Sequence, residues 1–139
     1  MGGTPPRAPL APDAFPNLPV IDGVRFATAE AGVKYAGRKD VMLAVCDPGT
    51  AVAGVFTRSA TRSAPVLDCQ AKLGGDSSDG AAILVNSGNA NAFTGNHGEE
   101  AVAGVAAAAT AALGLPAEAV FIASTGVIGE PLDASGFEA

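Results

Sequence analysis

The sequence lacks tryptophan and has only one histidine and two cysteines among its 139 residues. Its second half also lacks basic residues: the last is Lys72, whereas residues 76–138 hold eight of the 14 acidic residues. Proteins that bind nucleic acids take much of their affinity from clustered Lys and Arg. With a net charge of −6 and this distribution, we expect no nucleic-acid partner.

Few side chains are available for metal or redox chemistry. Cys46 and Cys69 lie in apolar stretches without C-x-x-C spacing, so we predict free thiols rather than a disulfide or metal ligands. His97 cannot form a metal site by itself, and its Gly/Asn-rich surroundings favour an exposed or helix-capping role. We therefore predict no bound metal and no resident cofactor.

No apolar run is long enough to cross a membrane. The longest, residues 101–113, is interrupted by Gly104 and Thr110. Residues 1–19 contain six of the ten prolines and no apolar run typical of a signal peptide, and Pro6 stands where a myristoylation motif needs Ser or Thr. We predict a Pro-rich mobile leader over residues 1–22, one folded unit over residues 23–139, and a cytoplasmic location.

The remaining composition is 48% hydrophobic with 18 glycines, which is typical of a compact α/β protein built from small side chains. Alternating apolar residues predict three successive antiparallel strands over residues 24–28, 41–45 and 52–57, the last two joined by a turn at Asp47-Pro48-Gly49. Residues 65–73 are predicted as a short helix.

Further along, residues 81–86 and 120–123 are predicted as buried strands, with a helix over residues 101–113 between them. Asn96, followed by Glu99 three residues later, is the predicted N-cap of that helix. Gly104 would let the helix lie close to a sheet. After Pro131, another element begins.

Phosphate-binding, dinucleotide-binding, serine-hydrolase and zinc-protease motifs are all absent from the sequence. Two glycine-rich segments follow predicted strands: residues 86–92, NSGNANA, and residues 124–129, STGVIG. In the second, the Thr125 hydroxyl and the Gly126 N–H can converge on one point, as an oxyanion hole requires. Judged by the residues alone, an ordinary tight turn explains the second segment better, and a loop with left-handed backbone angles explains the first.

Four segments in this order resemble the ornithine acetyltransferase family of arginine biosynthesis. They are AGVFT at residues 53–57, APV at 64–66, VNSGNANA at 85–92 and ASTGVIGEPL at 123–132. The resemblance runs from about residue 23 to residue 139. It implies an α/β (α+β) fold, a layered sheet-and-helix sandwich similar to the N-terminal nucleophile hydrolases, of which residues 23–139 would be the N-terminal part, from the α chain.

The resemblance also implies a mechanism. Thr125 and Gly126 would form the oxyanion hole, and the nucleophile would be a threonine outside this chain, exposed at the start of a second (β) segment by self-cleavage. The acetyl group would pass from N-acetylornithine to glutamate by a ping-pong route, with acetyl-CoA as a further donor if the enzyme is bifunctional. The implied assembly is a heterotetramer of two α and two β chains.

Two other functions stay open. An aminopeptidase-like hydrolase of the same fold would use the same oxyanion hole with water as the acceptor. A non-catalytic binding or assembly subunit would explain a chain without its own nucleophile.

Overall fold

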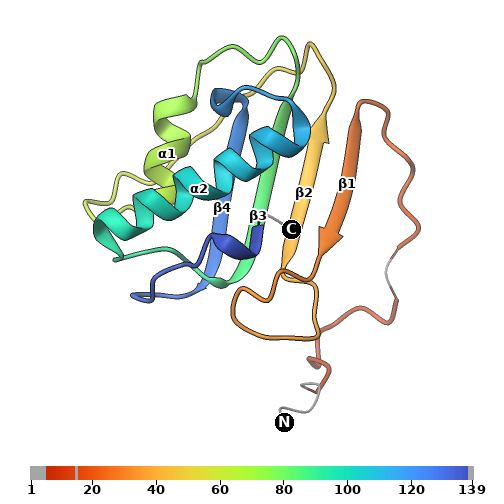
Figure 1. Ribbon diagram of the computed structural model, residues 1–139. Helices are drawn as coiled ribbons and strands as arrows, with labels where there is room; N and C mark the ends of the chain where they lie inside the picture. Colours follow the sequence, from red (N-terminus) through yellow and green to blue (C-terminus); the bar gives the residue numbers. More distant parts are fainter. Residues whose placement is uncertain (1–5, 15, 138–139) are drawn as a thin grey trace.

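The computed structural model describes residues 6–14 and 16–137, which contain one four-stranded sheet. The strands are β1 (Val24–Ala29), β2 (Val41–Cys46), β3 (Ala81–Asn89) and β4 (Val120–Val127), and they lie side by side in chain order (Figure 1). β1, β2 and β3 pair antiparallel, whereas β3 and β4 are parallel. The predicted antiparallel pairing of the first two strands is confirmed.

Two α-helices accompany the sheet: α1 (Ala64–Lys72) and α2 (Gly95–Leu113). Parallel strands need a crossover connection, and α2 supplies it between β3 and β4. The helix ends at Gly114, which adopts a left-handed φ of 69° and donates its N–H to the Thr110 carbonyl. Short 3-10 helices cover Ala117–Ala119 and Ser135–Phe137.

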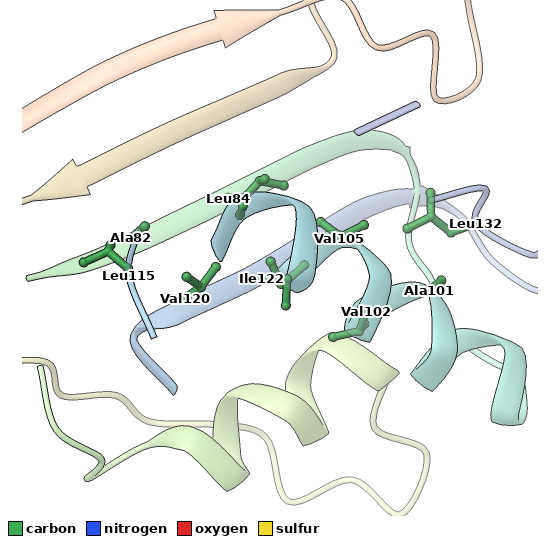
Figure 2. Packing of buried hydrophobic residues seen from close by; sticks show 11 residues of the cluster. Ala82, Leu84, Ala101, Val102, Val105, Leu115, Val120, Ile122 and Leu132 are labelled. Carbon is green, nitrogen blue, oxygen red and sulfur yellow. The ribbon is translucent and has the colours of Figure 1, made fainter. Parts of the chain in front are cut away.

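The core lies between α2 and the two parallel strands. Val105 of α2 and Val120 of β4 are completely buried, and Figure 2 shows them beside Leu84 and Ile122. Full burial of an apolar side chain of this size stabilises the folded state by about 2 kcal/mol. Leu132 joins the same cluster, so the segment after β4 packs into the core.

Helix α1 lies beside the outer strand β4. Its Lys72 Nζ donates to the Val120 carbonyl at 3.0 Å, and its Cys69 Sγ donates to the Ile122 carbonyl at 3.3 Å. These bonds satisfy carbonyl groups that an edge strand otherwise leaves unpaired.

The sheet face opposite α2 carries exposed apolar side chains. The strand register places Phe26, Ala44, Ile83 and Phe121 in one row across this open face. Phe26 is 69% exposed and Ile83 is 45% exposed. In the described residues, the helical layer therefore covers one face, and the mixed α/β class is confirmed.

The predicted strand over residues 52–57 is wrong. Residues 51–59 form neither helix nor strand, and part of this segment lines a cavity together with Ile83 and Phe121 of the open face. A segment placed over a sheet face has no neighbouring edge with which to exchange backbone hydrogen bonds. The turn predicted before it is confirmed, because Gly49 has a φ of 85° and Thr50 N–H bonds to the Asp47 carbonyl.

Helix α2 begins earlier than predicted, and Asn96 does not cap it. Thr94 holds the N-cap position, but its hydroxyl donates to Asn91 Oδ1 at 2.8 Å instead of capping the helix. Gly98 lies so close to Thr94 that a Cβ would come 2.2 Å from the hydroxyl oxygen. Contacts with the preceding loop, at Asn91 and Thr94, therefore hold the first turn of α2 in place.

Gly104 does not provide the expected close approach to the sheet. A Cβ on Gly104 would lie 3.1 Å from Cβ of Ala134, so this face of α2 packs against the segment after β4.

Outside the sheet, residues 6–14 and 16–22 form no helix or strand and are almost entirely exposed. Residues 1–5 and 15 of the predicted leader lie outside the described residues, and the leader's mobility stays a prediction. None of the described helices combines the length and apolar character that a membrane span requires.

Candidate functional site

The segment Ser124-Thr125-Gly126 continues strand β4 and is not the predicted turn. Strand β3 likewise runs on to Asn89, beyond its predicted end at residue 86. Thr125 pairs with Ser87, and Gly126 pairs with Gly88. Both glycine-rich segments of the sequence therefore lie side by side at one end of the two parallel strands.

Gly126 occupies a position that only glycine can fill. Its φ is 136°, and a Cβ there would lie 2.3 Å from the Gly88 carbonyl carbon and 2.5 Å from Asn89 N. The pairing is irregular at this point, since Asn89 pairs with both Thr125 and Val127. The result is direct contact between two backbones, which fixes where the Gly126 peptide lies.

Alternation along β4 determines where its polar groups point. Val120 and Ile122 are buried, whereas Thr125 is exposed on the open face. The carbonyls of Val120 and Ile122 point outward to α1, and that of Val127 points inward to Ala90 N–H at 2.9 Å. Within a strand, the N–H and C=O of one residue face the same edge and successive residues alternate, so the Gly126 N–H is directed to the outer edge of β4.

Three asparagines form a buried polar network beneath this segment. Asn86 Oδ1 accepts the Ser124 hydroxyl at 2.6 Å, and Asn86 Nδ2 donates to the Asn89 carbonyl at 2.9 Å. Asn89 Nδ2 donates to the carbonyls of Glu130 and Pro131 at 3.0 and 3.2 Å.

The third asparagine, Asn91, ties the network to α2. Its N–H donates to Asn89 Oδ1 at 2.7 Å, and its Nδ2 donates to the Gly98 carbonyl at 2.9 Å. Asn91 has a φ of 44°, which confirms the prediction that this segment adopts left-handed angles. The sequence interpretation missed the side-chain roles of Asn86 and Asn89. Amide side chains at and just beyond the end of the predicted strand, residues 81–86, were the available signal.

A charged pair lies beside the same strand ends. Lys34 Nζ contacts the Glu130 carboxylate, and a Cβ on Gly88 would lie 2.8 Å from Cβ of Lys34. The Lys34 loop is held by the buried Asp40 carboxylate, which accepts the N–H groups of Ala31 and Val33 at 2.7 Å each. Sequence reasoning did not single out these residues, because nothing in the chain order brings Lys34 to Gly88.

An apolar cavity of about 360 Å³ lies on the open face and ends near the candidate site. Its lining includes Phe121 and Ala123, which share a face of β4 with Thr125, and the thiol-bearing Cys69. Burial raises the pKa of the Cys69 thiol above its ordinary value, so this group is a neutral thiol rather than a thiolate nucleophile.

The remaining sequence predictions concern metal and thiol chemistry. Cys46 and Cys69 are free thiols, as predicted. His97 is exposed, with Nδ1 at 3.7 Å from Glu100 Oε2. In the part of the chain that the structure describes, no three His, Cys, Asp or Glu residues are grouped to hold a metal ion.

Comparison with known proteins identifies the family. The pattern of the ArgJ family matches residues 25–139, which is most of the sequence. This chain belongs to the ArgJ family. It is 70% identical over 125 residues to the arginine biosynthesis bifunctional protein ArgJ of Ruegeria pomeroyi, covering 90% of this chain and 31% of that protein. The ArgJ protein of Bradyrhizobium diazoefficiens is 58% identical over 131 residues, again with 31% of its length covered.

Two crystal structures share the fold. The ArgJ protein of Bacillus halodurans superposes with a TM-score of 0.76 at 31% identity, over 84% of this chain and 60% of that chain. Ornithine acetyltransferase of Mycobacterium tuberculosis, crystallised with ornithine, gives a TM-score of 0.70 at 36% identity, over 84% of this chain and 63% of that chain. The predicted family is confirmed, and the chain spans about a third of the length of these curated relatives.

Proposed function

We propose that this chain is a segment of an ornithine acetyltransferase and that Thr125 and Gly126 form its oxyanion hole. The observation that supports this most directly is the placement of the two donors at the end of β4. The exposed Thr125 side chain lies on the open face, and the Gly126 N–H is directed to the outer edge beside it. A group bound at that corner can meet both donors.

Acetyl transfer passes through two tetrahedral intermediates, and each carries an oxyanion that such donors stabilise. A nucleophilic threonine outside this chain attacks the acetyl carbonyl of N-acetylornithine, its hydroxyl proton passes to a base, and the carbonyl oxygen becomes an anion. Collapse of the tetrahedral intermediate breaks the amide bond, releases ornithine with that proton, and leaves an acetyl-enzyme. The glutamate amine then attacks the ester carbonyl and gives a proton to the base. Collapse of this second intermediate breaks the ester C–O bond, returns the proton to the threonine oxygen and releases N-acetylglutamate. Each oxyanion-hole donor contributes about 3 kcal/mol to stabilisation of the transition state.

A threonine at a new chain terminus can use its own α-amino group as the base, since an unperturbed α-amino pKa of about 8 suits proton transfer near neutral pH. We assign this nucleophile to a β segment, within a cytoplasmic heterotetramer of two α and two β chains. Acetyl-CoA is a further acetyl donor if the enzyme is bifunctional, as the names of the relatives indicate for those proteins.

The experiment is a chimaera in which this chain replaces the matching segment of the Ruegeria pomeroyi protein, to which it is 70% identical. We expect the chimaera to release ornithine from N-acetylornithine over repeated turnovers only when glutamate is present, with N-acetylglutamate formed in equal amount. Release of acetate without glutamate would instead identify a hydrolase. A folded chimaera without turnover would contradict the proposal and favour the non-catalytic subunit.

A further inference from the structure

We propose that Asn86 and Asn89 are positioning residues that hold the Thr125-Gly126 segment from both ends. This inference rests on the proposed function. Neither residue is assigned a contact with substrate; both act through hydrogen bonds to the chain on either side of the oxyanion donors.

Asn86 fixes the residue before Thr125. It is 0% exposed, and its Oδ1 accepts the Ser124 hydroxyl at 2.6 Å. Its Nδ2 donates to the Asn89 carbonyl at 2.9 Å. A single carboxamide thus links the strand that precedes Thr125 to the bulged backbone that lies against Gly126.

Asn89 fixes the chain after Gly126. It is 3% exposed, and its Nδ2 donates to the Glu130 carbonyl at 3.0 Å and to the Pro131 carbonyl at 3.2 Å. Its own backbone pairs with Thr125 and Val127, on either side of Gly126. Asn89 therefore holds the site through both backbone and side chain.

The cost of burying these amides indicates what they provide. A buried amide gains little net stability from hydrogen bonds that replace those to water, and apolar side chains of similar volume would fill the space as well. A carboxamide, however, both donates and accepts, so it fixes the relative position of two backbone segments. An oxyanion hole needs that precision, because a misplacement of about 1 Å lowers a rate by roughly 100-fold.

The test is a double-mutant cycle between Asn89→Asp and Thr125→Ala in the Ruegeria pomeroyi chimaera. Aspartate keeps the volume and the acceptor for Asn91 N–H but removes both donors to residues 130 and 131. We expect Asn89→Asp to lower kcat about 10- to 100-fold, with KM changed less than about twofold, because oxyanion stabilisation acts in the transition state. In the Thr125→Ala background the same change should lower kcat by a smaller factor than it does with Thr125 present, because one of the two donors that Asn89 positions is already gone.

Asn91→Asp is the matched control. Asn91 is equally buried and belongs to the same network, but its Nδ2 donates to Gly98 of α2 and not to the chain around Thr125. We expect it to lower the melting temperature without changing kcat by more than about threefold. Equal kcat losses for Asn89→Asp and Asn91→Asp, or a loss from Asn89→Asp that multiplies with that of Thr125→Ala, would overturn the proposal.

Two further measurements keep the proposal falsifiable. Ser124→Ala removes the hydroxyl bonded to Asn86 and leaves the buried Asn86 Oδ1 without that partner, so we expect kcat to fall about 3- to 10-fold and the melting temperature to fall as well. Amide hydrogen exchange at residues 125 and 127, whose N–H groups face β3, should accelerate in Asn89→Asp but not in Asn91→Asp. Unchanged exchange would overturn the positioning role even in a chimaera without turnover, whereas the missing turnover itself counts against the proposed function.

Discussion

Gly88 and Gly126 lie opposite each other on β3 and β4, with no room for a side chain between their backbones. A Cβ on Gly126 would lie 2.3 Å from the Gly88 carbonyl carbon, and the φ of 136° is itself unfavourable for any other residue. The candidate site thus depends on a close approach of two parallel strands.

Replacing Gly126 by alanine should therefore destabilise the chain by at least about 2 kcal/mol, since steric overlap adds to backbone strain. Gly129→Ala is the control: its φ is 81°, but nothing lies within 4 Å of an added Cβ, so only strain of about 1 kcal/mol is expected. Urea denaturation followed by circular dichroism measures both. If Gly126→Ala and Gly129→Ala lowered the free energy of unfolding equally, the close approach at Gly126 would be contradicted.

Asp40→Asn should loosen the loop that carries Lys34. The two carboxylate oxygens each accept one backbone N–H, and asparagine would replace one acceptor by an NH₂ group facing a donor. We expect the free energy of unfolding to fall by about 1–3 kcal/mol and the backbone amides of residues 31 and 33 to exchange faster. Exchange that stays unchanged would mean that the carboxylate does not hold this loop.

The two cysteines should differ in reactivity. Burial raises the pKa of Cys69, and only the thiolate reacts with iodoacetamide, so at pH 8 the Cys69 reaction is slowed by both access and protonation. We expect Cys46, which is only partly buried, to be alkylated first, and Cys69 to react on unfolding. Peptide mass mapping after timed alkylation distinguishes the two sites. Early modification of Cys69 in the folded chain would contradict the packing of α1 on β4.

Periodicity predicted the elements that bury an apolar stripe. The apolar runs of β2, β3 and β4 and the alanine-rich body of α2 are visible in the sequence because each packs against the core. The segment at residues 52–57 has the same apolar character but covers a face of the sheet, and strand propensity does not reveal whether a free edge is available.

The candidate site was predictable in part. The family resemblance singled out Thr125 and Gly126, but a strand continuing through Gly126 was not predicted, because glycine is typical of turns and the close approach to Gly88 depends on tertiary pairing. The bonds of Asn86 and Asn89 join residues up to 42 positions apart. Such pairings arise only once the parallel strands are aligned.

The most direct test of the account is the rate of acetyl transfer from N-acetylornithine to glutamate by the chimaera with Thr125→Ala, compared with Thr125→Ser, which keeps the hydroxyl. Because the Thr125 side chain is exposed, neither change should lower the melting temperature appreciably. We expect alanine to lower kcat on the order of 100-fold and serine less than about fivefold. A Thr125→Ala chimaera that keeps its full kcat, or loses it only in proportion to a loss of stability, would contradict an oxyanion hole at Thr125.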